Sequence, residues 1–176
     1  LYLMWHGVKD DTKWNDPENE LCIAFGPLCG NTSYPGSGKS IVTTISPLTG
    51  IPVDCNVGGH FGPYAKFSGW DAIEIQGKAD EEVIVYIDGD SGKVKILSAP
   101  DKETNSHILA ENLINEFAEN PDKRQFVSVV SAGQGAENVL ISCLNFSFWD
   151  KRRKVARLKQ AGRGGTGTVL RDKKLK

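Results

Sequence analysis

The chain has 176 residues and a net charge near −1, because 21 lysines and arginines oppose 22 aspartates and glutamates. This length suits a single domain. The balanced charge argues against a dedicated nucleic-acid binder, which is basic overall. The apolar runs are far shorter than the roughly 20 residues that a membrane helix needs. We therefore expect no nucleic-acid partner and no membrane span.

The cysteines are few and lie far apart in the sequence. No two of them form a Cys-x-x-Cys pair, which argues against a zinc ribbon and against a four-cysteine iron–sulfur motif within this chain. A dense disulfide scaffold is also excluded. We expect small core residues at all four positions: Cys22, Cys29, Cys55 and Cys143. Few cysteines and no visible export signal favour the cytoplasm.

Neither end of the chain resembles a native terminus. The chain starts at Leu1 inside an apolar run, and residues 171–176 stop before any signal that closes a helix. We therefore expect a piece of a longer protein, incomplete at both ends. The alternatives are a processed mature chain or a gene with a trimmed start.

The first half of the sequence predicts strands separated by turns. Residues 31–38 form turns throughout, and the glycines of 56–59 predict a flexible corner. A short helix is expected over 60–68, because Pro63 lies near its start, where a missing N–H costs little. Short apolar, β-branched or alternating runs predict three strands, over 21–25, 40–45 and 71–76.

The second half predicts a hairpin, a helix and two further strands. The hairpin joins 83–87 to 93–97 through a Gly/Asp turn. Residues 103–118 carry apolar side chains at helical spacing. The rest predicts strands over 126–130 and 139–146, a basic run over 150–159 and a helix opening at 168. Because strands outnumber helices without regular alternation, we predict one α+β domain with mixed or antiparallel sheets.

Two glycine-rich segments imitate nucleotide-binding motifs without their context. Residues 36–40 read GSGKS, but the phosphate-binding loop needs glycine where Ser33 stands. Residues 162–167 read GRGGTG, but a charged run replaces the preceding apolar strand of a dinucleotide fold. Both segments still expose backbone N–H groups beside a cation, Lys39 or Arg163. Together with the NVGG corner, they favour a large phosphate-bearing ligand over three ordinary turns.

Five blocks of the sequence carry a family resemblance: GPLCG (26–30), SPLTG (46–50), NVGGHFGPYAKFSGWDAIEIQGKA (56–79), GAENV (135–139) and AGRGGTGTVLRDKKLK (161–176). Their order and spacing resemble the N-terminal domain of the tungsten-containing aldehyde ferredoxin oxidoreductase family. The long central block and AGRGG are specific to that family, whereas SPLTG and GAEN alone are not. The segment 140–160 departs from typical members.

The resemblance implies a two-sheet, β-rich base with few helices, over residues 1–176, that cradles a bis-pyranopterin (molybdopterin-type) cofactor. Family members hold tungsten or molybdenum between the two pterins and oxidise an aldehyde to a carboxylic acid. Their electrons pass through a [4Fe–4S] cluster to ferredoxin. The cluster ligands and proton-handling residues lie in later domains, so we expect no catalytic residue here and no activity from this chain alone.

The first two corners match cofactor-binding positions of the family. Lys39 stands where the family has a basic residue, usually arginine, and would act as a point charge for pterin or phosphate. Asn56, Val57 and Gly58 match an Asn-x-Gly corner whose Asn carbonyl helps to hold a magnesium ion between the two pterin phosphates. An oxygen-only, partly hydrated site suits magnesium.

The third corner reads Arg-Ala-Ala-Gly-Arg-Gly-Gly in the family. Lys159 replaces the first arginine, and Gln160 replaces the alanine whose carbonyl is the other magnesium ligand. A backbone carbonyl survives that change, although the larger side chain affects local packing. The remaining cofactor-binding positions match the family: Ala161, Gly162 and Arg163.

Two further features have competing interpretations. His60 follows the NVGG corner and could hydrogen-bond the pterin, but we expect it to pack. The basic run over 150–159 is interpreted as a solvated loop or as a docking patch for an acidic electron carrier or partner subunit.

Three functions stay open at this point. The first is the cofactor-binding part of an aldehyde oxidoreductase that works with ferredoxin or an electron-transfer subunit. The second is the branch of the family that reduces aromatic-ring thioesters of the benzoyl-CoA type. The third is a non-catalytic small scaffold subunit of a split enzyme, bound to a larger catalytic chain. A homodimer is compatible with each of them.

Overall fold

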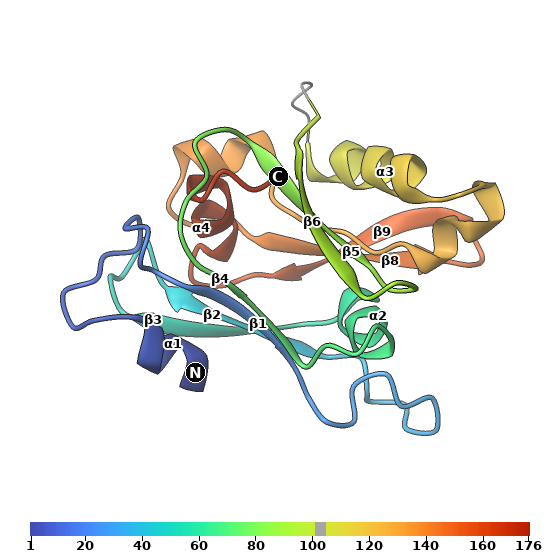
Figure 1. The fold of residues 1–176 in the computed structure, drawn as a ribbon, viewed down its shortest axis with the longest axis horizontal. Coiled ribbons are helices and arrows are strands. Elements are labelled where there is room, and N and C mark those ends of the chain that lie inside the picture. Colours follow the sequence, from blue (N-terminus) through green and yellow to red (C-terminus); the bar gives the residue numbers. More distant parts are fainter. Residues whose placement is uncertain (101–104) are drawn as a thin grey trace.

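The computed structural model describes residues 1–100 and 105–176, and Figure 1 shows their arrangement. Four strands form an antiparallel sheet in the order β3-β2-β1-β4. Leu21 and Ile23 face the core, whereas Cys22 faces helix α1 (Tyr2–Gly7), as the alternation along a strand requires. The strands of this sheet are Leu21–Phe25 (β1), Ser40–Ile45 (β2), Pro52–Val57 (β3) and Ala72–Ile75 (β4).

A three-stranded antiparallel sheet lies over the first sheet, in the order β7-β8-β9. Its strands are Val130–Ser131 (β7), Leu144–Asp150 (β8) and Val155–Ala161 (β9). The main core fills the space between the two sheets. Burying each large apolar side chain there contributes about 1.5–3 kcal/mol. Its most buried members are Leu21, Val42 and Val57 from the first sheet and Leu144, Phe146 and Ala161 from the second.

A hairpin and a long helix form a second, smaller core. Strands β5 (Val83–Asp88) and β6 (Lys93–Ser98) pair antiparallel, and helix α3 (Ser106–Phe117) packs between this hairpin and the three-stranded sheet. The side-chain oxygen of Asn105 accepts hydrogen bonds from the backbone N–H groups of His107 and Ile108, which fixes the start of α3.

The remaining helices are short. Helix α2 (Phe61–Phe67) connects β3 to β4, and 3₁₀ turns cover Pro121–Phe126 and Gln134–Asn138. Helix α4 (Thr166–Asp172) lies between the two large sheets, and its residues 166–171 are buried. The buried Arg171 of this helix forms ion pairs with Glu82 and Glu137.

The predicted α+β class with a two-sheet, β-rich base is confirmed, and the hairpin adds a third, two-stranded sheet. The strands over 21–25 and 40–45, the hairpin and the helix over 60–68 are also confirmed within a residue or two. Of the helix expected over 103–118, residues 103 and 104 lie outside the described residues, and the helix begins at Ser106 because Asn105 caps it.

Three predictions at the strand level are wrong. Residues 126–130 contribute only Val130 to a strand, because Pro121 opens a 3₁₀ turn that extends to Phe126. The strand expected over 139–146 begins at Leu144 instead. The basic run over 150–159 is not a solvated loop. Its residues 151–154 form a turn, and Val155–Ala161 pairs with β8 despite its charges.

None of the helices in the described residues has the length and apolar character needed to cross a membrane.

Candidate functional site

The three glycine-rich corners meet where the edge strands β3 and β9 of the two sheets run side by side. A Cβ atom placed on Gly58 would lie 3.9 Å from Cγ of Lys159, and one placed on Gly164 would lie 2.5 Å from Cγ1 of Val53. From the first contact to the second, residue numbers fall from 58 to 53 along β3 and rise from 159 to 164, so the two segments run antiparallel. We call residues 38–39, 56–59 and 159–164 the seam.

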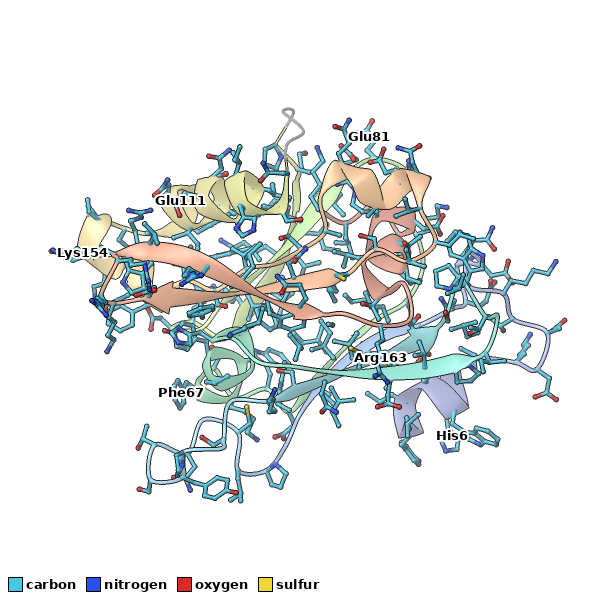
Figure 2. The ribbon with its side chains drawn as sticks, turned by 180° about the vertical axis from the view of Figure 1, so that it is seen from behind. His6, Phe67, Glu81, Glu111, Lys154 and Arg163 are labelled. Atoms are coloured by element: carbon cyan, nitrogen blue, oxygen red, sulfur yellow. The ribbon has the colours of Figure 1, made fainter. Side chains whose placement is uncertain are left out.

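Lys39 joins the seam through the register of β2. Ser40 pairs with Val57, so Lys39 comes next to Gly58 as the two strands diverge. A Cβ placed on Gly38 would lie 3.9 Å from the carbonyl oxygen of Gly59. All three predicted corners are therefore neighbours in space, although they are far apart in the sequence. Figure 2 shows Arg163 beside β3, at the opposite end of the β8–β9 hairpin from Lys154.

The seam carries positive charge that the fold itself does not neutralise. Lys39, Lys159 and Arg163 are exposed. Within residues 1–100 and 105–176, none of the three forms an ion pair with a carboxylate. The Nζ atom of Lys159 lies 5.3 Å from the centroid of the Phe148 ring, which holds this cation over β8. The seam is thus suited to an anion.

Gln160 does not obstruct the seam. Its Nε2 donates a hydrogen bond to Oδ1 of Asn145, 3.3 Å away, and Asn145 in turn donates to Ser106 at the start of α3. Successive side chains of a strand point to opposite faces, so Lys159 and Ala161 point toward the first sheet instead. The replacement of the family's alanine by glutamine leaves the face toward β3 unchanged. Ala161 is completely buried and Asn56 is exposed.

One glycine in each corner has no structural reason to be glycine. Gly38, Gly58 and Gly162 lack positive φ, and a Cβ on any of them would meet open space or ordinary contacts. By contrast, Gly164 and Gly165 need their positive φ of 75° and 70°. Gly26 and Gly135 also lack positive φ, and a Cβ there would meet nothing within 4 Å, but both glycines lie outside the seam. Bare backbone at three neighbouring corners allows a ligand to approach closely.

This arrangement fits a phosphate-bearing ligand with a hard cation. Exposed backbone N–H groups and unpaired lysine and arginine side chains bind phosphate oxygens. Backbone carbonyls, such as those of Asn56 and Gln160, supply the oxygen ligands that magnesium accepts.

A second polar cluster lies under α1, and the sequence pattern did not reveal it. Glu20, Cys22 and Glu74 bring potential ligand atoms within 4.8 Å of one another. Glu20 accepts hydrogen bonds from Gln76 Nε2 at 2.7 Å and from the Cys22 thiol at 3.6 Å. Burial and the neighbouring Glu20 and Glu74 raise the pKa of Cys22 to about 11, so the thiol stays protonated at neutral pH. Glu20 and Cys22 therefore have hydrogen-bond partners within the fold itself.

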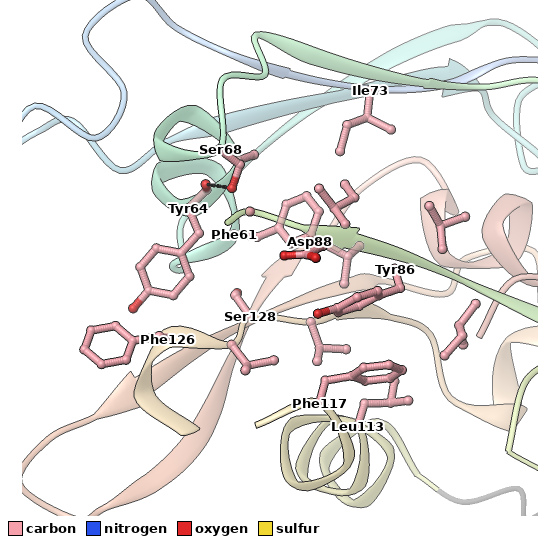
Figure 3. A pocket seen from close by; sticks show the side chains of 18 of the residues that line it. Phe61, Tyr64, Ser68, Ile73, Tyr86, Asp88, Leu113, Phe117, Phe126 and Ser128 are labelled. Atoms are coloured by element: carbon pink, nitrogen blue, oxygen red, sulfur yellow. Dashed lines mark hydrogen bonds between the residues drawn. The ribbon is translucent and has the colours of Figure 1, made fainter. Parts of the chain in front are cut away.

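A cavity lies away from the seam, between the first sheet, the hairpin and α3 (Figure 3). It has a volume of about 780 Å³. Its walls are mostly apolar, the ring centroids of the stacked Tyr86 and Phe117 are 4.6 Å apart, and Asp88 also lines it. None of the predicted site residues lines it, so it is separate from the seam.

The fold and the seam together define a β-rich domain with an exposed cationic edge between two sheets. The chain belongs to the family described as aldehyde ferredoxin oxidoreductase, N-terminal domain, whose model matches residues 1–176. This finding confirms the resemblance seen in the sequence.

Relatives of known name support the same family. The chain is 39% identical over 162 residues to the tungsten-containing aldehyde ferredoxin oxidoreductase of Pyrococcus horikoshii, covering 91% of this chain and 24% of that protein. It is 38% identical to the enzyme of the same name from Pyrococcus furiosus, covering 100% of this chain and 27% of that protein. The chain thus spans about a quarter of the length of these relatives.

A solved structure has the same fold. It is described as the active site complex BamBC of benzoyl coenzyme A reductase in complex with 1,5-dienoyl-CoA. It matches with a TM-score of 0.82 and 32% identity over 99% of this chain and 24% of that chain.

Proposed function

We propose that residues 1–176 form the base that holds a tungsten or molybdenum bis-pyranopterin cofactor in an aldehyde-oxidising enzyme. The relatives named for tungsten and for aldehyde ferredoxin oxidoreductase support this assignment. The observation that carries it is the meeting of three corners, each with a bare glycine and two with an exposed cation. In this proposal the [4Fe–4S] cluster and the proton-handling groups belong to further domains, and ferredoxin accepts the electrons.

The proposed role of this chain is to bind and orient. Lys39, Lys159 and Arg163 would neutralise the pterin phosphates, and the N–H groups beside Gly58 and Gly162 would donate to the phosphate oxygens. The bound metal–pterin group would supply the two-electron chemistry on the aldehyde. Because the seam is an edge between two rigid sheets, it would fix the position of the cofactor before substrate arrives.

Magnesium has a defined place in the proposal. The backbone carbonyls of Asn56 and Gln160 would each provide one oxygen ligand, and phosphates and water would complete an octahedral shell. The side chain of Gln160 faces Asn145, so it does not compete with its own carbonyl for this position.

The second candidate is reduction of an aromatic thioester, as in the benzoyl-CoA branch. The observation that favours it is the likeness to the BamBC structure over nearly the whole chain. The corners would hold the same cofactor in either case, so the two candidates differ in the substrate and in the direction of electron flow, because aldehyde oxidation releases electrons and reduction of the aromatic ring consumes them.

Elemental analysis of the protein, produced together with its native downstream coding sequence, tests the cofactor assignment. We expect tungsten or molybdenum, with phosphorus and magnesium, in active material. Active material that contains neither tungsten nor molybdenum would refute the proposal. A turnover assay that compares short aldehydes with benzoyl-CoA then separates the two candidates, and a chain 1–176 that is inactive alone is the expected control.

A further inference from the structure

His60 closes the free edge of strand β8. Strand β7 pairs with β8 only up to Phe146, and Ser147 N donates to the Val129 carbonyl just beyond it. Alternate residues of a strand present their N–H groups to the same edge. The backbone N–H of Trp149 therefore points to the same edge as that of Ser147, but no residue of β7 pairs with it. His60 fills that position instead of a strand.

Two hydrogen bonds make this closure. The backbone N–H of His60 donates to the Ser147 carbonyl at 2.9 Å, and the backbone N–H of Trp149 donates to Nδ1 of His60 at 3.2 Å. The imidazole therefore serves as the acceptor that a neighbouring strand would otherwise provide.

The contacts of His60 define its tautomer. Nδ1 must carry a lone pair to accept from Trp149, so the proton of the neutral ring is on Nε2. Tyr64 Oη also lies 3.3 Å from Nδ1, but its proton goes to the Gln125 carbonyl at 2.6 Å. Burial, and then the charge of Lys151, lower the pKa of His60, which favours this neutral form.

The charged groups around the ring agree with that form. Tyr64 of α2 faces Nδ1, and Lys151 follows β8. On β8 itself, Phe148 and Trp149 carry cations over their rings, Lys159 and Arg124. Of these cations, Lys151 acts on the ring and disfavours an imidazolium at position 60.

The two hydrogen bonds between His60 and β8 also position the residues of the seam. Residues 58–60 cross the inner face of β8: Gly58 lies beside Lys159 of β9, Gly59 approaches Phe146, and His60 holds the opposite edge. Gly59 has a φ of 112°, and a Cβ there would lie 3.1 Å from both Phe146 Cβ and the Ser147 carbonyl oxygen. The Phe148 ring contacts His60 edge-on at 6.1 Å and also supports Lys159.

We propose that His60, held as the Nε2–H tautomer, is a positioning residue of the seam: it anchors the NVGG corner to β8 and so sets the separation between the Gly58 backbone and Lys159. This role adds a function to a residue for which the sequence predicted packing. Its ligand, a phosphate-bearing cofactor, rests on the proposed function, whereas the anchoring of the corner does not.

A matched pair of variants tests the anchoring. Asn places its side-chain oxygen near the position of Nδ1, whereas Gln reaches the position of Nε2. Hydrogen exchange of the Trp149 amide should stay within about 3-fold of wild type in His60→Asn and accelerate at least about 10-fold in His60→Gln. Tyr64→Phe should leave the exchange rate of this amide unchanged, because the Tyr64 hydroxyl donates its hydrogen bond to the Gln125 carbonyl. Equal exchange in both His60 variants, or an Nδ1 whose ¹⁵N shift shows a bound proton at pH 7.5, would overturn the proposal.

Binding of magnesium diphosphate tests the link to the seam. We expect His60→Asn to bind within about 3-fold of wild type and His60→Gln to bind at least about 10-fold more weakly, with melting temperatures of both variants close to each other. Equal affinity of the two variants would overturn the positioning role. If the wild-type chain binds no diphosphate while the Trp149 amide behaves as expected, the ligand assigned to the seam is wrong and the anchor itself stands.

Discussion

Glycine has two different roles in this chain, which neighbouring residues of one corner illustrate. Gly164 and Gly165 are needed by the fold, because their positive φ and close contacts leave no place for a side chain. Gly162, two residues earlier, has neither constraint. A residue that the fold leaves free, in a corner beside exposed cations, is available for a ligand.

Substituting Gly162 by alanine separates stability from binding. We expect the free energy of unfolding to change by less than about 0.5 kcal/mol, because a Cβ there meets open space and alanine reduces the entropy of the unfolded chain. Affinity for magnesium diphosphate should fall by about 10-fold, because the methyl group blocks approach to the backbone. Gly26→Ala is the control, since it is equally unconstrained but outside the seam. Equal binding by both variants would remove Gly162 from the site.

The pKa of His60 predicts how stability depends on pH. Burial and Lys151 lower this pKa below its usual value of 6.5, so the unfolded chain binds a proton more readily than the folded chain. The resulting stabilisation is complete above pH 6.5 and is lost as the pH falls through the folded pKa. Urea unfolding at several pH values should show this decline below pH 6.5 in wild type and a weaker decline in His60→Asn. Identical slopes would contradict the assignment.

At the scale of elements, the start of helix α4 requires glycine at its N-cap. Its N-cap, Gly165, has a φ of 70°, and a Cβ there would overlap the Leu140 carbonyl oxygen and lie 2.9 Å from Cγ of Pro47. The helix that follows is buried between the sheets, so it has no room to shift away from this contact.

Gly165→Ala should therefore destabilise the protein much more than the same change in an open turn. Gly92 is the matched control, because its φ is 67° and nothing lies within 4 Å of a Cβ there. We expect Gly92→Ala to cost about 1 kcal/mol from backbone strain alone and Gly165→Ala to cost more than about 3 kcal/mol. Chemical denaturation measures both. Similar costs would mean that the contacts of Gly165 relax easily.

The sequence predicted those elements whose pattern is set by burial on one side. Strand β1 alternates between the core and α1, and the hairpin β5–β6 has clear turn residues, so both were predictable. Strand β9 was not, because Arg157 and Lys159 stay exposed at the sheet edge and resemble a solvated run. Strand β3 was missed because it begins at Pro52 and ends in the glycine corner. Motif resemblance marked the seam residues, whereas the role of His60 needed the register of β7 against β8.

At the scale of the whole molecule, the seam depends on two sheets rather than on any one loop. Lys39 and Asn56 come from the first sheet, and Lys159 and Arg163 come from the end of the second. The core between the sheets, with Phe146 and Val57 fully buried, holds these edges together. The corners have a common ligand only if that core keeps the two sheets in register.

Amide chemical shifts of the chain during titration with magnesium diphosphate test most directly whether the three corners form one binding surface. We expect shifts that saturate together at residues 38–39, 56–59 and 159–164, and that vanish when Lys39 and Arg163 are replaced by alanine. Shifts confined to one corner, or centred on the hairpin β5–β6, would show that the three corners do not form one binding surface.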